Sequence, residues 1–233
     1  MNKKDRLIVA LDVPSLKEAE ALVKTLSGSV HIFKIGKELF TSAGPEAVKM
    51  VHRHGAKVFL DLKFHDIPNT VAQALRAASN LNVFMVNVHC LGGRVMMQKA
   101  AEAVKASCKN PPLLLGVTVL TSLAENDLKQ VGIQKKIKDE VSALAKLAKK
   151  SGLDGVVASA QEIRLIRKAC GKDFLIVTPG VRPAWAAVGD QKRIMTPREA
   201  IQAGSDFIVI GRPITQHSDP LAAARRILDE TNH

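Results

Sequence analysis

The sequence predicts an α/β protein that folds as a closed (β/α)8 barrel, also called a TIM barrel, in a single domain over residues 1–233. Eight short segments rich in Val, Ile, Leu and Phe alternate with longer amphipathic stretches, which is the pattern of parallel strands buried on both faces and connected by helices. The length suits one barrel, and we find no linker or low-complexity tract that would divide the chain.

The expected strands cover residues 7–13, 31–36, 57–64, 83–89, 113–120, 155–159, 174–180 and 207–213. An open, doubly wound sheet is the alternative to a closed barrel. A dinucleotide-binding sheet of that kind usually carries G-x-G-x-x-G after its first strand, whereas the turn here is LDVPS. The barrel is therefore favoured.

Several helices between the strands are indicated by the residues at their ends. Ser15 begins SLKEAEALVKTL with Glu18 three positions later, which is the pattern of a capping box. In TPREAIQAG, Thr196 and Pro197 suit a helix start and Gly204 suits its end, and SDPLAAARRIL begins in a similar way. The stretch QKKIKDEVSALAKLAKKSG alternates lysines with apolar positions at helical spacing, so it predicts a helix with one solvated face.

Composition argues against several classes of function. The net charge of +12 would suit a polyanion, but aromatic residues make up only 3% and tyrosine is absent, so platforms for stacking bases are scarce and we predict no nucleic-acid partner. No apolar run reaches the roughly 18 residues of a membrane span. The first apolar stretch contains Asp12 and precedes Pro14, so it favours a strand over a signal peptide. We therefore expect a cytoplasmic location. The three cysteines are scattered without a CxxC pair, which argues against disulfides or zinc.

The segment DLKFHDIPNT places charges of both signs at the end of the third strand, where barrels carry their catalytic residues. Asp61 and Lys63 are two positions apart, so both can face the barrel mouth about 6.6 Å apart along the strand, with Leu62 pointing outward. Lys34, on the neighbouring strand, can lie between acids such as Asp61 and Asp12. Such an alternating chain favours protonated lysine and ionised aspartate, and a protonated lysine can deliver a proton to a carbanion.

Other residues at the strand ends complete the candidate site. For a phosphate group, the last two βα loops offer Arg182, Gln191, Gly211 and Arg212. Other polar residues at the strand ends are Asn87, His89, Thr118, Thr121 and Ser122. We expect structural roles for His65 and His89. Asp12, Asp61 and Asp66 could hold Mg²⁺, but the interleaved lysines would compete with it, so we predict no metal.

Two structural interpretations stand beside these functional ones. The charges could form a salt-bridge cluster without function, which a single Asp–Lys pair would favour. Four or five charges at the catalytic face of a barrel favour an active site instead. The glycine–arginine dipeptide could likewise be an ordinary surface turn, since it is common.

The segments LDVPS, FKIGKELF, DLKFHDIPNT, VTVLTS, TPGVRP…GDQKRIMTP and VIGRPIT together resemble the bacterial orotidine 5′-phosphate decarboxylase family. The resemblance runs in order from about residue 7 to the C-terminal helix. It implies decarboxylation of orotidine 5′-monophosphate to uridine 5′-monophosphate and CO₂ in pyrimidine biosynthesis, without a cofactor. It further implies that Lys63 donates a proton to C6 of the pyrimidine, that Asp61 lies near the departing carboxylate, that Lys34 links the charges and that Asp12 contacts the ribose.

The resemblance also implies a homodimer in which Asp66 and Thr70 reach the neighbouring subunit's site. Thr121, with Ser122 nearby, would contact the pyrimidine edge. The implied phosphate ligands are Gln191, Gly211 and Arg212, with Arg182 in the same region.

Three alternatives remain open at this stage. A sugar-phosphate decarboxylase of the same superfamily would share the D-x-K-x-x-D block but depend on Mg²⁺. A basic nucleic-acid-binding protein would bind in a strongly salt-dependent way. A catalytically inactive phosphate-binding barrel is disfavoured by the intact Asp-Lys-Asp set.

Overall fold

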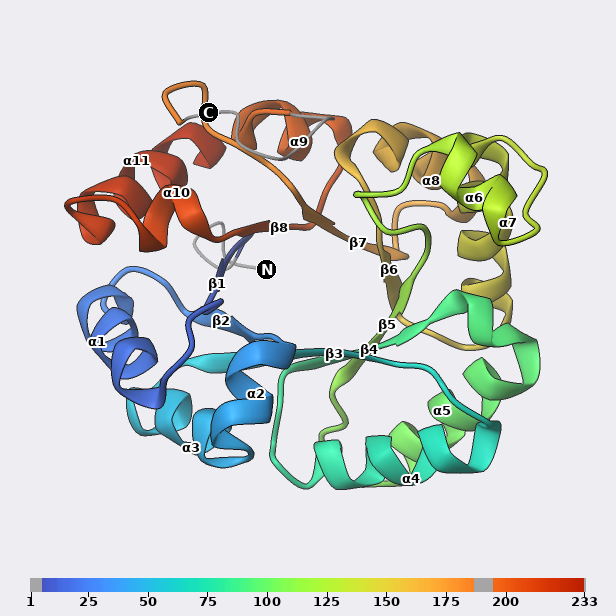
Figure 1. Cartoon of the computed structure of the whole chain (residues 1–233), viewed down its shortest axis with the longest axis horizontal. Coiled ribbons are helices and arrows are strands. Elements are labelled where there is room, and N and C mark those ends of the chain that lie inside the picture. Colours follow the sequence, from blue (N-terminus) through green and yellow to red (C-terminus); the bar gives the residue numbers. More distant parts are fainter. Residues whose placement is uncertain (1–5, 187–194, 233) are drawn as a thin grey trace.

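The structure is a computed structural model that describes residues 6–186 and 195–232. Eight parallel strands form a closed barrel in sequence order, and β8 pairs back to β1 (Figure 1). The strands are β1 Leu7–Ala10, β2 Ile32–Ile35, β3 Lys57–Phe64, β4 Met85–His89, β5 Leu113–Val117, β6 Gly155–Val157, β7 Leu175–Pro179 and β8 Phe207–Ile210. The predicted barrel is confirmed. That all 233 residues form one domain stays a prediction.

Most strands end earlier than the apolar pattern suggested. The expected strand over 7–13 ends at Ala10, and the one over 113–120 ends at Val117. The polar residues that follow them therefore lie in loops above the barrel instead of continuing the sheet.

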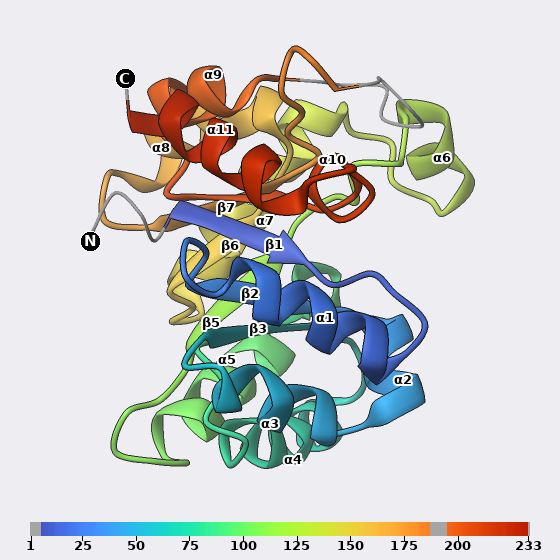
Figure 2. The ribbon, with the colours of Figure 1, turned by 90° about the vertical axis from the view of Figure 1, so that its left-hand side faces the viewer.

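Helices surround the barrel on its outer side (Figures 1 and 2). They are α1 Leu16–Leu26, α2 Lys37–Ala43, α3 Glu46–Arg53, α4 Pro68–Ser79, α5 Gly93–Lys105, α6 Glu125–Gln130, α7 Ile137–Lys150, α8 Ile163–Cys170, α9 Pro197–Ala203, α10 Arg212–Thr215 and α11 Pro220–Asn232. Two 3-10 turns, η2 Cys90–Gly92 and η3 Ala160–Glu162, precede α5 and α8. Two α-helices follow each of β2, β5 and β8, where the sequence predicted one. The additional helices were not predicted because they are too short to show helical periodicity.

The predicted helix ends are present. The Ser15 hydroxyl accepts a hydrogen bond from the Glu18 amide at 3.3 Å and donates one to the Glu18 carboxylate at 2.8 Å. Thr196 and Glu199 form a reciprocal capping box at α9, which ends at Gly204 with φ of 110°. These contacts satisfy amide groups that a helix start leaves without partners. Outside β1, α1 and α11 pack against each other, so the first and last helices meet where the barrel closes (Figure 2).

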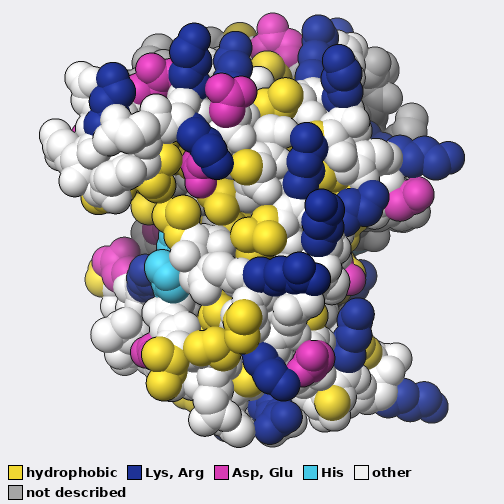
Figure 3. All heavy atoms as spheres, turned by 90° about the vertical axis from the view of Figure 1, so that its right-hand side faces the viewer, with side chains coloured by type: hydrophobic (Ala, Val, Ile, Leu, Met, Phe, Trp, Pro, Cys, Tyr) yellow, Lys and Arg dark blue, Asp and Glu magenta, His cyan; other side chains and the backbone are white. Residues whose placement is uncertain are grey.

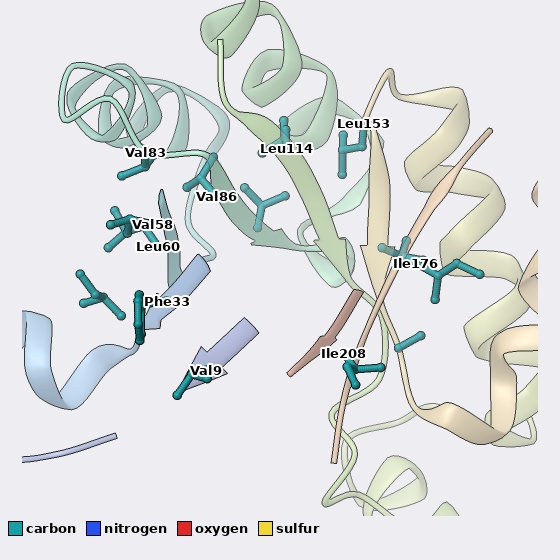
Figure 4. Packing of buried hydrophobic residues seen from close by; sticks show 14 of the residues in the cluster. Val9, Phe33, Val58, Leu60, Val83, Val86, Leu114, Leu153, Ile176 and Ile208 are labelled. Carbon is teal, nitrogen blue, oxygen red and sulfur yellow. The ribbon is translucent and has the colours of Figure 1, made fainter. Parts of the chain in front are cut away.

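Two clusters of buried apolar side chains stabilise the barrel. The outer cluster lies between strands and helices and includes Val9 and Leu60 (Figure 4). The inner cluster fills the barrel and includes Ile8 and Phe59, the sequence neighbours of those two residues. Successive side chains of a strand point to opposite faces, so this alternation determines which residues face the barrel mouth.

The lysine-rich stretch forms α7, as predicted. Its buried side is made of Glu140, Val141, Leu144, Ala145 and Ala148, and its lysines Lys138, Lys146, Lys149 and Lys150 are exposed. Figure 3 shows the face that includes this side of the molecule, where lysine and arginine side chains outnumber acidic ones. Among the described residues, no helix combines the length and apolar character needed to cross a membrane.

Candidate active site

The barrel mouth is divided into two unlike halves. On each of β1 to β4, one inward side chain of the inner apolar cluster lies below the mouth: Ala10, Ile32, Phe59 and Met85. Two positions later on each segment the inward residue is polar: Asp12, Lys34, Asp61 and Asn87. The side chains of β5 to β8 that line the mouth are apolar: Val117, Val157, Pro179 and Val209. We call these the charged half, formed by β1 to β4, and the apolar half, formed by β5 to β8.

Four residues of the charged half form a chain of alternating charge, here called the charge chain: Asp12, Lys34, Asp61 and Lys63. The Lys34 ammonium lies 2.8 Å from an Asp12 oxygen and 3.5 Å from an Asp61 oxygen. The second Asp61 oxygen lies 2.6 Å from the Lys63 ammonium. Lys34 and Asp61 are buried, whereas the Asp12 side chain is 57% exposed. The structure thus brings together the four charges that the sequence singled out.

The backbone that presents Lys63 differs from the regular strand assumed from the sequence. Leu60 pairs with Val86, and the next pair is Phe64 with Val88, so residues 61–63 lie opposite the single residue 87. Within this bulge Lys63 has φ of 54°, in the left-handed region. That conformation costs roughly 1–2 kcal/mol for a residue other than glycine. The folded chain therefore holds Lys63 in place against a local backbone penalty.

Asn87 stabilises this bulge, and sequence reasoning gave it no role. Its amide nitrogen donates to the Asp61 carboxylate at 2.6 Å, and its carbonyl oxygen accepts from the Lys63 main-chain N–H at 2.8 Å. Asn87 is fully buried. One side chain thus fixes both the carboxylate and the backbone of the lysine beside it. The sequence did hint at a role for Asn87, because strand alternation makes it an inward polar residue at the same level as Asp61.

His89, the last residue of β4, lies close to this cluster. Its ring centroid is 5.4 Å from that of His65. Burial lowers the pKa of His89 to about 4, and the nearby His65, Lys63 and Lys37 act in the same direction, with Asp61 opposing them. The imidazole is therefore neutral at neutral pH.

Asp66 and Thr70 do not join the charge chain within this subunit. Both are exposed, and the Asp66 carboxylate accepts a hydrogen bond from the Ile67 amide at 2.6 Å. Beside them are exposed apolar side chains: Ile67 is 66% exposed, Val95 62% and Leu91 45%. In the described part of the chain, no ion pair connects Asp66 to the charge chain.

A cavity of about 150 Å³ separates the charged half from the apolar half. Its walls include Lys34, Asp61 and Lys63 on one side and Val157, Pro179 and Val209 on the other. Thr121 also lines this cavity, whereas Ser122 is exposed. The cavity is apolar along one wall and carries charges of both signs along the other, which suits a flat ring with a polar edge.

Two further cavities continue from the first toward β7 and β8. One, of about 270 Å³, shares Lys34 with the first and extends past Asp12 to Gly211 and Arg212. The other, of about 410 Å³, is lined by Arg182, Trp185, Ala186, Arg212, Pro213, Gln216 and His217. The three together make an elongated site with lysines at one end and arginines at the other.

Three of the predicted phosphate residues, Arg182, Gly211 and Arg212, lie at the arginine end. Arg182 is buried, and its main-chain N–H donates to the Met195 carbonyl at 3.0 Å. Gly211 directly precedes α10, which begins with Arg212. Gln191 lies outside the described residues. Among the residues that are described, no group of three or more His, Cys, Asp or Glu side chains could hold a metal ion.

The model of the orotidine 5′-phosphate decarboxylase / HUMPS family matches residues 5–227. The chain belongs to this family. It is 59% identical over 229 residues to the orotidine 5′-phosphate decarboxylase of Syntrophotalea carbinolica, with 97% of this chain and 94% of that protein aligned. It is 55% identical to the protein of the same name from Moorella thermoacetica, over 99% and 93% of the two chains. The family predicted from the sequence is therefore confirmed.

Solved structures agree with this assignment. Orotidine 5′-phosphate decarboxylase from Lactobacillus acidophilus superimposes with a TM-score of 0.88 at 39% identity, covering 98% of this chain and all of that one. The family's barrel is thus reproduced over almost the whole chain.

Proposed function

We propose that this chain decarboxylates orotidine 5′-monophosphate to uridine 5′-monophosphate and CO₂, a step of pyrimidine biosynthesis, in the cytoplasm. The observation that carries the proposal is one elongated site with the charge chain at one end and Arg182 and Arg212 at the other. Membership of the family and 59% identity to a protein of that name support the same reaction.

The charge chain supplies what this reaction needs. When the bond between C6 and the carboxylate breaks, its electron pair stays on C6 in the plane of the ring, where no π system can spread it. A positioned cation stabilises such a charge strongly in a site that excludes water. The Lys63 ammonium, held 2.6 Å from Asp61, stabilises the carbanion and then gives it a proton, after which the amine regains a proton from solvent.

The rest of the site positions the substrate. The apolar half covers the pyrimidine ring, with Thr121 at its edge and Asp12 toward the ribose. Arg182, Gly211 and Arg212, together with Gln191, bind the phosphate. Binding energy from this remote group orients the reacting carbon against Lys63, which is how non-reacting parts of a substrate contribute to rate.

The active form is a homodimer in which Asp66 and Thr70 of each subunit complete the partner's site. Their exposure in the single subunit, next to the exposed apolar side chains of Ile67 and Val95, supports this arrangement. Apolar side chains grouped on a surface are typical of a protein–protein interface.

The decisive experiment follows the ultraviolet absorbance of orotidine 5′-monophosphate with purified protein and excess EDTA. We expect turnover by the wild type with EDTA present and its loss in Lys63→Ala. Folded wild-type protein without turnover, or turnover only after Mg²⁺ is restored, would instead favour the metal-dependent sugar-phosphate reaction.

Mixing inactive variants tests the dimer. Lys63→Ala and Asp66→Ala each remove one half of a site that spans two subunits. In mixed dimers one of the two sites regains both residues, so an equal mixture should recover on the order of a quarter of wild-type activity after subunit exchange. No recovery from dimers shown to have exchanged would place Asp66 in its own subunit's site.

A further inference from the structure

The segment from Lys63 to Asp66 presents two charges that act in different places. The Lys63 ammonium faces the cavity of its own subunit, whereas the Asp66 carboxylate is exposed at the surface. Lys63 has a left-handed backbone conformation, and strand pairing resumes only at Phe64, the last residue of β3, which pairs with Val88. Beyond Phe64 no strand pairing holds the described segment, so neighbouring side chains contribute to its direction.

Strand β4 supplies contacts on both sides of this segment. Asn87 accepts the Lys63 main-chain N–H at 2.8 Å. Two positions later on the same face, the His89 ring lies 5.4 Å from the His65 ring, with the planes inclined at 38°. This separation is within the range of packed aromatic pairs. Asn87 therefore holds the segment before the turn, and His89 packs against it one residue before Asp66.

The His65 side chain is exposed, but it also lies close to a second element. A side-chain carbon added at Gly92, in the turn after β4, would clash with Cε of Met96 and lie 3.3 Å from Cδ2 of His65. The turn at Gly92 is therefore near the ring. His65 thus has His89 on one side and this turn on another, which limits the directions that the chain can take toward Asp66.

We propose that His89 is a positioning residue, whose ring supports His65 and thereby fixes the segment that presents Lys63 to its own site and Asp66 to the partner subunit. This inference rests on the proposed function, since it assigns Asp66 to the partner's site. His89 contacts no reacting atom in this account and acts only through the segment it supports.

Burial and, after it, the charges around His89 lower the pKa of its ring and so favour the neutral form. Lys63 and Asp61 face it from β3, His65 from the following loop and Lys37 from the start of α2. Three of these four groups disfavour a positive imidazole. A proton on His89 would add repulsion against the Lys63 ammonium, so the ring serves as a packing surface and not as an acid.

Two substitutions separate packing from acid–base chemistry. His89→Ala removes the ring, and we expect kcat to fall on the order of 10-fold to 100-fold, because a displacement of about 1 Å at a reacting group costs that much, with KM changed by less than about threefold. His89→Phe keeps a planar ring without a titratable group and should restore kcat to within about threefold of wild type. The matched control is His52→Ala, a histidine of α3 far from the site, which should leave kcat unchanged.

Hydrogen exchange gives a readout that does not depend on turnover. The amide of Lys63 is hydrogen-bonded to Asn87, so in wild type it should exchange slowly. We expect faster exchange over residues 63–67 in His89→Ala, and wild-type protection in His89→Phe and in His52→Ala.

A double-variant cycle tests whether His89 acts through His65. If it does, His65→Ala with His89→Ala should lose no more kcat than His89→Ala alone, within about twofold. Losses that multiply, or a His89→Phe variant as slow as His89→Ala, would overturn the proposal. Wild-type protein without turnover would count against the proposed reaction instead, while the exchange measurement would still decide the support by His89.

Discussion

Ion pairs lie at both ends of the barrel, but their surroundings differ. At the N-terminal ends of β7 and β8, the Arg167 guanidinium contacts the Asp206 carboxylate. It also donates to main-chain carbonyls at 2.6–3.3 Å: those of Gly171, Lys172, Phe174 and Gly204. Asp206 in turn accepts the Ile176 amide at 2.7 Å. At the opposite end, Lys34 and Lys63 line a cavity.

The difference shows how one type of interaction serves two purposes. The Arg167 network is closed, since main-chain carbonyls of two segments and the Asp206 carboxylate satisfy its donors, and it ties α8 to the loops that precede β7 and β8. The charge chain is open, since its lysines line the space where a substrate would lie. A closed network of partly buried charge contributes to stability, whereas an open one leaves its charged groups available to interact with a ligand. Substitutions at the two ends should therefore affect different measurements.

The largest effect should follow from Lys63→Ala. We expect kcat to fall by at least about 10⁴-fold, because the only proposed proton donor and the cation nearest C6 are both removed. The free energy of unfolding should change by less than about 1 kcal/mol, because Asp61 keeps Lys34 and Asn87 as partners. Lys63→Gly should be as inactive as Lys63→Ala but more stable than that variant by about 1 kcal/mol, since glycine accepts the left-handed backbone. Equal denaturant midpoints for the two variants would contradict the backbone penalty.

The second-largest effect should follow from Arg167→Ala, and it should appear in stability and not in kcat. Losing the guanidinium leaves Asp206 and several carbonyls without their partner, so we expect about 3–5 kcal/mol less stability in urea unfolding. At 25 °C the variant, where still folded, should keep kcat within about threefold of wild type. Arg164→Ala, an exposed arginine of the same helix, is the matched control and should cost less than about 0.5 kcal/mol. A large loss of kcat in folded Arg167→Ala would remove the distinction between the two ends.

A third, smaller effect concerns pH. The pKa of His89 is about 4 in the folded protein and near 6.5 in the unfolded chain. Between these values only the unfolded chain takes up the proton, so stability should fall as the pH drops from 6.5 to 4, by at most about 3 kcal/mol, with no further loss from this group below pH 4. His89→Phe should have a shallower acid limb than wild type. Identical slopes for the two proteins would show that His89 is not held neutral.

The smallest effect should come from substituting Asp154, which is placed before its strand as Asp206 is. In the part of the chain that the structure describes, Asp154 forms no ion pair with an arginine. It lies just before β6 and accepts the Leu114 amide of β5 at 2.7 Å, as Asp206 accepts from β7. Asp154→Ala should lower stability by about 1–2 kcal/mol through the lost hydrogen bond. Asp154→Asn keeps an acceptor and should lose less. A cost as large as that of Arg167→Ala would mean that the carboxylate, not the arginine, stabilises this end.

The sequence predicted the barrel, the order of its strands and the four members of the charge chain, because burial and strand alternation are local patterns. It did not predict the bulge at Lys63, since a bulge depends on how β3 pairs with β4. Asn87 was named among the strand-end polar residues but was given no role for the same reason: its contacts appear only when residue 87 lies opposite residues 61–63. The Arg167 network was not predicted because it lies at the N-terminal ends of the strands, where a barrel is not expected to carry catalytic residues.

The division of the barrel mouth into a charged and an apolar half has a consequence for protein engineering. The side chains proposed to carry out the chemistry come from β1 to β4, in the first half of the chain, and those proposed to cover the ring come from β5 to β8. Substitutions at Val157, Pro179 or Val209 therefore offer a way to admit a different heterocycle without altering Lys63 or its supports. Libraries for a new substrate can accordingly be confined to the second half of the chain, with the first half kept as a constant catalytic module.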